Sequence, residues 1–305
     1  MAHCTADESS KGVRILKTVI IYHTDIDGHL SGAILHEHLA DRNPIMVRRN
    51  YDDEFDWSLI DKDTEVWMAD LSLQPWTEMI RLQQEAGKLI WIDHHKSAIA
   101  YYDEWVEAEG SPIDGRRQDG IAACRLCWEY CNPGVPLPRA VFLADRYDVW
   151  QWQDVPGAIE YQYGTKFYET DPATRDGQDF WFQQLNPIKA DSLVKQVEEE
   201  GKLLMRYKER SNSSYMSDNC FETEIDGLKV VAVNRKGNSQ QFDSVFNPEK
   251  HHAMLTFAWA KGMWTVSLYT SRKDVDVSAV AKKHGGGGHA GAAGFQCQEL
   301  PFELK

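Results

Sequence analysis

Long apolar runs, cysteine and positive charge are all scarce in this sequence. No apolar run is long enough to span a bilayer, and the first residues, MAHCTADESSKGVRILK, contain no apolar segment of the kind a signal peptide needs. Six cysteines in 305 residues are too few for a disulfide scaffold, which favours reduced thiols. The formal net charge of −14 argues against long duplex nucleic acid, which usually binds a basic surface. We therefore expect a cytoplasmic protein with no membrane contact and no long duplex partner.

This acidic balance is still compatible with a small anionic substrate, provided that metal ions supply positive charge locally. Three cysteines, Cys124, Cys127 and Cys131, have a spacing that would suit either zinc or one face of a helix. Because no fourth zinc ligand follows nearby, the stretch ACRLCWEYC is predicted to be a buried helix.

The order of apolar segments predicts an α/β fold. Strand-like runs over 15–24, 64–70 and 88–93 alternate with amphipathic helices over 25–40 and 75–86. Strands that alternate with helices form a parallel sheet with right-handed crossovers and helices on both faces. With 42% hydrophobic and 26% charged residues, the chain is an ordinary globular protein whose length favours two domains.

Acidic and histidine side chains follow these strand-like runs. His23, Asp25 and Asp27 are two residues apart in an extended stretch, so they project from one face and converge on one point. Gly28 allows a tight turn into the following helix, and Gly32 allows close packing of that helix on the strand.

The next two runs end in the same way, and so does a fourth run near residue 145. The candidate ligands there are Asp70, Asp93, His94, His95, Asp145 and, three residues on, Asp148. Carboxyl ends of parallel strands meet at one edge of a sheet, which is where open α/β sheets bind ligands. Carboxylates and neutral imidazoles are ligands for divalent transition metals. The sequence therefore predicts a metal site at this edge.

The remainder of the chain predicts a long linker helix and a smaller domain. We place the first domain at 1–190, the helix at 191–217 and the second domain at 218–305, with strands, a final helix and a glycine-rich run, HGGGGHAGAAGF. Such a run lets backbone N–H groups approach an anion closely. The aromatic-rich segment 149–182 could stack on bases or pack in the core, and core packing is the favoured interpretation.

Taken together, the motifs HTDIDG, the strand end at Asp70, IDHH, ADRYD and DVSAVAKKHGGGGHAGAAGF resemble the DHH phosphoesterases with their DHHA1 domain. The match runs in the same order from about residue 19 to 296. Within this superfamily the sequence is most similar to the group of small-oligoribonucleotide hydrolases, or nanoRNases, and cyclic-nucleotide phosphodiesterases. The resemblance implies an N-terminal parallel-sheet DHH domain and a C-terminal α/β DHHA1 domain.

The resemblance also implies two Mn²⁺ ions, for which Mg²⁺ or Co²⁺ could substitute. One ion would be held by His23, Asp25 and Asp70, and the other by Asp27, Asp70, His94 and Asp145, with Asp148 as the alternative to Asp145. Asp70 would bridge the two ions. His95 would face the substrate phosphate, and Asp93 would orient a histidine.

Substrate binding is expected to involve the second domain, through Arg272, Gly286, Gly287, Gly288 and His289. The implied function is hydrolysis of very short oligonucleotides or nucleotide phosphoesters by a two-metal mechanism. A cyclic mononucleotide or dinucleotide phosphodiesterase is the alternative, followed by a pyrophosphatase or polyphosphatase and, without catalysis, a nucleotide sensor. The oligomeric state stays open, a homodimer included.

Overall fold

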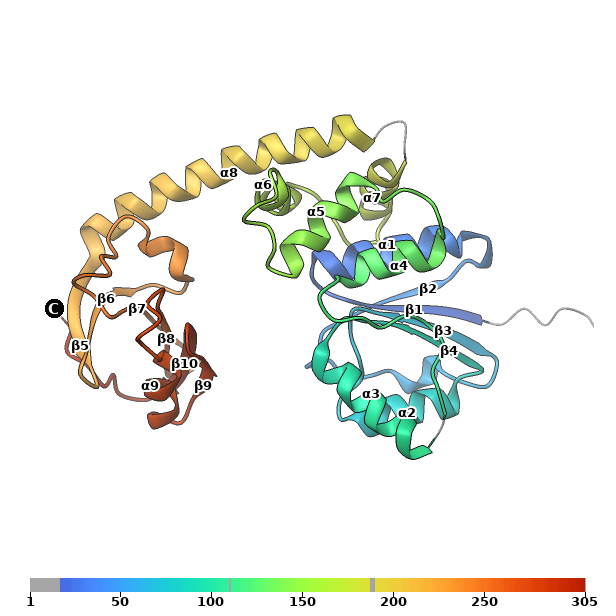
Figure 1. The fold of residues 1–305 in the computed structure, drawn as a ribbon, viewed down its shortest axis with the longest axis horizontal. Helices are drawn as coiled ribbons and strands as arrows, with labels where there is room; N and C mark the ends of the chain where they lie inside the picture. Colours follow the sequence, from blue (N-terminus) through green and yellow to red (C-terminus); the bar gives the residue numbers. More distant parts are fainter. Residues whose placement is uncertain (1–16, 110, 187–189, 305) are drawn as a thin grey trace, which may run out of the picture. The chain divides into compact units, whose positions relative to one another are not determined.

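The computed structural model describes residues 17–109, 111–186 and 190–304. The N-terminal stretch used above for localisation, with the first two residues of the first predicted strand, lies outside them. The chain divides into two compact units, Met1–Leu204 and Met205–Lys305, each described here by itself (Figure 1). Among the described residues, no helix is both long and apolar enough to cross a membrane.

The N-terminal unit contains a parallel sheet, as the sequence predicted, and this sheet has four strands. Its strands are β1 (Lys17–His23), β2 (Ile45–Arg49), β3 (Thr64–Ala69) and β4 (Lys88–Ile92), in the spatial order β2-β1-β3-β4. The sequence analysis did not anticipate β2. This strand lies at the sheet edge, is mostly half-buried or exposed and ends in two arginines, so it lacks the fully apolar run of the other three.

One face of the sheet is covered by helices α1 (Ile26–His38) and α4 (Ala123–Cys131) (Figure 1). Ile20 and Tyr22 of β1 pack in this layer with the buried side chain of Cys124. In agreement with the prediction, the cysteines lie on a helix, and Cys124 and Cys127 are buried free thiols.

The other face is covered by α2 (Trp76–Glu85) and α3 (Lys96–Glu109) (Figure 1). Val19 and Ile21, which alternate with the β1 residues of the first layer, pack here. Helices on both faces of a parallel sheet confirm the predicted fold class.

The strand order contains a point at which the chain reverses its direction of winding. From β1 the chain first adds β2 on one side and then crosses to add β3 and β4 on the other. In open α/β sheets, ligands bind outside the carboxyl ends of the strands at such a switch point. In this sheet the switch point lies between the ends of β1 and β3.

After the sheet, the unit continues with α5 (Arg139–Asp148), α6 (Ala158–Gly164) and α7 (Arg175–Leu185). The run that contains Asp145 was interpreted as a strand end, and this was wrong because the run is the helix α5. Within the aromatic-rich segment, Tyr161 and Trp181 are fully buried in the core.

Helix α8 (Ala190–Asn219) follows, so the predicted long helix is present. The division between the two compact units falls within α8, after Leu204. The described residues also contain short 3-10 helices: η1 (Ala40–Arg42), η2 (Trp57–Leu59), η3 (Thr165–Phe167) and η4 (Ser239–Phe242).

The C-terminal unit is a mixed sheet on which α9 (Val277–Lys283) packs. Met216, near the end of α8, packs with Val231 and Val233 of the same sheet. The strands are β5 (Cys220–Ile225), β6 (Leu228–Asn234), β7 (Ala253–Ala260), β8 (Met263–Tyr269), β9 (Gly287–His289) and β10 (Ala292–Cys297), in the order β5-β6-β7-β8-β10-β9. Only β6 and β7 pair in parallel. The glycine-rich run therefore forms the β9–β10 hairpin at one edge of the sheet.

Candidate metal centre

The carboxyl ends of β1, β3 and β4 bring the predicted ligands to one edge of the sheet. Tyr22 of β1 is level with Ala69 of β3, which is level with Ile92 of β4. The residues that come next are therefore neighbours in space: His23 ends β1, Asp70 follows β3, and Asp93, His94 and His95 follow β4. This arrangement places the side chains at the switch point of the sheet.

Two further acids come from the first turn of α1. Asp25 is the N-cap residue, and its side chain accepts a hydrogen bond of 2.8 Å from the N–H of Gly28. Asp27 is buried, and its oxygens accept bonds of 2.8 and 2.7 Å from the N–H groups of Ala123 and Cys124 at the start of α4. Asp27 thus joins the starts of two helices and is fixed in place by both.

Gly28 and Gly32 have the packing roles expected of them. A Cβ atom at Gly28 would lie 2.4 Å from the carbonyl oxygen of His23, and one at Gly32 would lie 2.7 Å from the ring of Tyr22. Without side chains at these positions, α1 can start immediately beside the end of β1.

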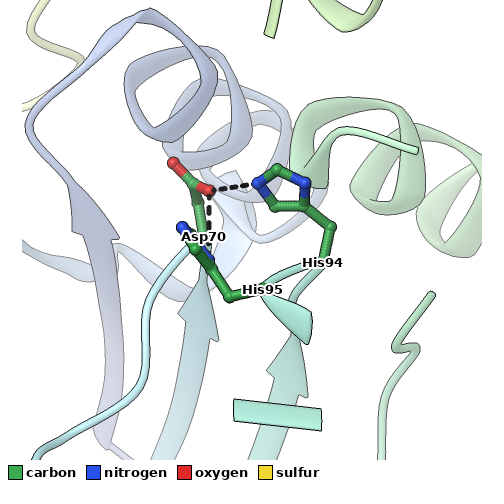
Figure 2. Close-up of side chains that lie close together, drawn as sticks. All are labelled: Asp70, His94 and His95. Carbon is green, nitrogen blue, oxygen red and sulfur yellow. Dashed lines mark ion pairs between the residues drawn. The ribbon is translucent and has the colours of Figure 1, made fainter. Parts of the chain in front are cut away.

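Asp70 lies between two histidines. Its Oδ2 atom is 3.5 Å from Nδ1 of His23, and its Oδ1 atom is 3.3 Å from Nε2 of His94. Figure 2 shows the Asp70 carboxylate facing the His94 ring, with His95 alongside. Asp25 completes the first side of the cluster, because its Oδ2 atom is 2.9 Å from Nδ1 of His23. Among the described residues, Asp70 belongs both to a group with His23 and Asp25 and to one with His94 and His95.

A third group of possible ligands surrounds Nε2 of His94. The nearest oxygens of Asp148 and Asp27 lie 3.4 and 3.6 Å from this nitrogen. Asp148 is the last residue of α5, so the end of that helix supplies a carboxylate to the cluster.

Asp145, which the fourth motif offered as the ligand, occupies a different environment. Its carboxylate is fully buried, with one oxygen accepting a bond of 2.9 Å from the N–H of Ala122. The other oxygen lies 3.3 Å from Arg125 and 2.6 Å from Arg146. Two guanidinium groups face Asp145, whereas Asp148 faces His94, so of the two acids offered by the sequence we favour Asp148 as the candidate ligand.

Asp93 holds the ring of His95. The fully buried Oδ1 atom of Asp93 lies 2.7 Å from Nδ1 of His95 and also accepts from the backbone N–H groups of His94 and His95, at 2.7 and 3.2 Å. A carboxylate only accepts hydrogen bonds, so Nδ1 of His95 carries the proton in this contact. The His95 side chain remains about one-third exposed, which leaves its Nε2 side accessible.

Tyr51 is a site residue that the sequence analysis missed. Its ring centroid is 5.5 Å from that of His23 and 6.1 Å from that of His95. Burial, with the negative charge of Asp93 and Asp70 nearby, raises the pKa of the Tyr51 hydroxyl. Tyr51 follows β2 by two residues. If that edge strand had been recognised in the sequence, Tyr51 would have been placed at the carboxyl end of the sheet, together with His23.

The carboxylates of this cluster are buried close together, and the positive charge near them is too small to balance their negative charge. Burial raises the pKa of Asp70 well above its usual range, and burial together with Asp70 and Asp148 does the same for Asp27. The adjacent carboxylates of Asp25 and Asp70 raise the pKa of His23 to about 10. Each shift has the direction expected where a cation is needed.

The residues present fit a divalent metal centre. The described residues provide no hydrogen-bond partner for Nδ1 of His23 or Oδ2 of Asp70, although both atoms are buried. His23 Nδ1 lies close to Asp25, but the contact lacks the geometry of a hydrogen bond. Buried polar atoms normally have hydrogen-bond partners. A nitrogen and an oxygen that face one another without such partners indicate that an ion binds between them. Mixed oxygen and nitrogen donors suit Mn²⁺ and similar ions.

The predicted substrate-binding residues lie in the C-terminal unit, in the hairpin and before α9. Gly286, Gly287, Gly288 and His289 are all exposed. Gly288 has φ of +135°, and a Cβ atom there would lie 2.6 Å from the carbonyl oxygen of Ala292, so the hairpin itself requires this glycine.

Arg272 is already engaged within its own unit. Its guanidinium makes hydrogen bonds of 3.1 and 2.6 Å to the carboxylate of Asp274 and one of 2.9 Å to the carbonyl oxygen of Pro248. Binding a substrate phosphate through Arg272 would therefore have to replace these contacts.

Comparison with known proteins finds similarity to other chains in sequence and in fold. The chain matches no family model. It is 24% identical over 234 residues to the oligoribonuclease NrnB of Bacillus subtilis, a match that covers 72% of this chain and 55% of that protein. The chain spans just over half the length of the curated relatives it matches.

Two solved structures share the fold along most of the chain. The pGpG-specific phosphodiesterase PggH of Vibrio cholerae has a TM-score of 0.53 at 14% identity, with 92% of each chain covered. The DHH domain of a member of the s1p family of ribosomal proteins also has a TM-score of 0.53, at 15% identity, with 92% of this chain and 82% of that one covered.

Proposed function

We propose that this chain, which has the motifs and the fold of the DHH phosphoesterases, is a metal-dependent phosphodiesterase that hydrolyses very short oligonucleotides. The observation that carries this proposal is the position of Asp70, whose two oxygens face His23 on one side and His94 on the other. A carboxylate so placed can be shared by two ions. Support also comes from the oligoribonuclease relative and from the fold shared with a phosphodiesterase specific for pGpG.

Two Mn²⁺ ions are proposed as the natural cofactor, with Mg²⁺ or Co²⁺ as substitutes. His23, Asp25 and Asp70 would hold one ion, and Asp70, Asp27, His94 and Asp148 the other. When bound, such ions lower the pKa of water and neutralise charge on a phosphoryl group. The buried N–H contacts of Asp27 and the N-cap position of Asp25 keep both carboxylates oriented before any ion binds.

His95 is proposed to act on the substrate itself. The Asp93 carboxylate accepts the Nδ1 proton of His95 and so fixes which ring nitrogen faces it. Nε2 is then directed away from Asp93, so that it can contact a substrate phosphate. The acid therefore fixes the orientation of the imidazole, which needs no rotation during the reaction.

Short substrates are favoured over long duplexes. The net charge of −14 supplies no basic track for a long backbone, so affinity must come from a few local contacts. We assign the exposed glycines of the β9–β10 hairpin, with His289, to one end of the substrate, because backbone N–H groups there are not covered by side chains.

The test is hydrolysis, with Mn²⁺ as the single divalent ion, of a matched panel. It contains a 5′-phosphorylated dinucleotide, a 24-mer RNA, cyclic AMP, a cyclic dinucleotide, 3′-phosphoadenosine 5′-phosphate and pyrophosphate. We expect the linear dinucleotide to give the highest kcat/KM. Preference for a cyclic substrate would support the alternative activity on the same centre. Cleavage of pyrophosphate alone, or of nothing in the panel, would overturn the proposal.

A further inference from the structure

Trp150, in the N-terminal unit, combines three features that the proposed function does not yet explain. It is 76% exposed, its φ of +58° lies in the left-handed region, and it comes two residues after Asp148. A bulky residue rarely adopts this conformation, and it persists only where the surrounding structure imposes it. Large apolar side chains gain free energy by burial, so a fixed and exposed indole needs a reason.

The loop that carries Trp150 is fastened on both sides. The N–H of Trp150 donates to the carbonyl oxygen of Tyr147 at 3.1 Å, and the N–H of Gln151 donates to that of Arg146 at 2.9 Å. Arg146 also contacts the Gln151 side chain and the buried Asp145 carboxylate. These contacts hold the turn that follows α5.

Trp150 is exposed, although the apolar residues on either side of it are packed. Val149 and Trp152 pack against the core of the N-terminal unit, whereas Trp150 between them does not. The ring of Trp152 also lies 6.4 Å from that of Tyr147. The chain is thus anchored before and after Trp150, and the indole is presented to solvent by a fixed turn.

The turn that carries Trp150 is close to the candidate metal centre. Two residues of chain span at most roughly 7 Å, so the backbone of Trp150 lies within that distance of the backbone of Asp148. The carboxylate of Asp148 is itself 3.4 Å from Nε2 of His94. The exposed indole therefore starts from a turn beside the cluster on which a nucleotide phosphate would sit.

We infer that Trp150 is a stacking platform for a nucleobase of the substrate and determines that the enzyme takes nucleotides in preference to base-free phosphoesters. The inference rests on the proposed function, because it adds base recognition to the same site. Stacking on an aromatic side chain tolerates every base, since each base has a π face. Trp150 would thus select for the presence of a base and not for its identity.

Two 5′-phosphorylated dinucleotide substrates with the same sugar-phosphate backbone test this inference, one with adenines and one with abasic units. Wild-type enzyme should prefer the adenine substrate. Trp150→Ala should raise its KM by about 5- to 150-fold, the range measured for loss of one stacked base, and leave the abasic substrate unchanged. Trp150→Phe should retain most of the preference, because a ring remains.

Two variants control for other effects of the substitution. Trp150→Asn removes the ring, but asparagine tolerates a left-handed φ. If the ring is what matters, this variant should have the KM of Trp150→Ala for the adenine substrate. If only the turn matters, it should have the KM of the wild type. Phe182→Ala removes another exposed aromatic, which lines a groove beside the C-terminal half of α1, and should leave both substrates unaffected. An equal loss on adenine and abasic substrates, or no loss on either, would overturn the inference.

A binding measurement separates this inference from the proposed function. A dinucleotide whose scissile oxygen is replaced by methylene cannot be hydrolysed, and stacking should quench Trp150 fluorescence, seen as the difference between wild type and Trp150→Phe. Quenching without hydrolysis of any substrate would contradict the proposed function but retain the stacking role. Hydrolysis of the dinucleotide with no difference in quenching would retain the function and refute the role of Trp150.

Discussion

At the carboxyl edge of the sheet β2-β1-β3-β4, charged side chains are buried and face one another, whereas residues 285–292 around the β9–β10 hairpin turn are exposed and mostly glycine or alanine. The first region can hold a compact cation through side-chain atoms such as those of Asp70 and His94. The second can offer mainly backbone N–H groups. The difference shows that side-chain substitutions should affect the first region strongly, while the second should respond mostly to added bulk.

The largest expected effect follows from Asp70→Asn. Loss of the carboxylate shared by the two sides of the cluster should lower kcat/KM by roughly 10³-fold or more, since metal charge stabilisation is worth several kcal/mol. The metal-free variant should be at least as stable as the wild type, because burial raises the pKa of Asp70 and makes its charge unfavourable in the fold. Activity assays and thermal unfolding in chelator measure the two effects. An active variant would contradict the bridging role.

The contrast between Asp148 and Asp145 comes next. Asp148→Asn should weaken Mn²⁺ binding by about 10- to 100-fold with little change in stability, by analogy with the loss of groups that support a metal site. Asp145→Asn should instead destabilise the fold by up to roughly 3 kcal/mol, because it removes the buried negative charge that pairs with Arg125 and Arg146, which are partly in water. Metal titration and denaturant unfolding distinguish the variants. The reverse pattern would return Asp145 to the metal site.

Binding of a metal ion to the candidate metal centre should release a proton from His23. With its pKa raised to about 10 in the metal-free fold, His23 is protonated at pH 7.5 and must lose that proton to coordinate an ion. Calorimetric Mn²⁺ titrations in buffers of different ionisation enthalpy should therefore detect proton release, and apparent affinity should rise with pH. The same raised pKa stabilises the metal-free fold fully below about pH 6.5 and progressively less towards pH 10. Buffer-independent binding enthalpies would argue against protonated His23.

Paired glycine substitutions in the hairpin should give the smallest effects. Gly288→Ala should destabilise the C-terminal unit by about 1–2 kcal/mol, because φ of +135° is strained for alanine. Gly287→Ala meets no atom within 4 Å, so it should leave stability unchanged. If backbone N–H groups bind the substrate, the added methyl at Gly287 should still raise KM. Unchanged KM in a stable Gly287→Ala variant would leave the hairpin without the proposed role.

Residues on β1, β3 and β4 were the most predictable from sequence. The runs that end at His23, Asp70 and Asp93 are almost continuously apolar, because both faces of those strands are buried. Parallel pairing then brings their ends together without further information. Strand β2 lacks this signal because most of its residues are half-buried or exposed, and Tyr51 was missed with it.

The choice between Asp145 and Asp148 depended on tertiary contacts. The two acids are three residues apart on α5, so spacing alone puts both near one face of the helix. Asp145 meets Ala122 and Arg125 from another part of the chain and its own neighbour Arg146, whereas Asp148 reaches His94. Helix periodicity in RAVFLADRYD, after Pro138, would have identified the helix but not the partners of each acid.

Anomalous diffraction at the manganese edge, from crystals grown with Mn²⁺, tests the central claim most directly. We predict two peaks about 3.5–4 Å apart, a spacing typical of two-metal hydrolases, with Asp70 between them. One peak should lie beside His23 and Asp25, and the other beside His94 and Asp148. A single peak, or two peaks that do not share Asp70, would contradict the account.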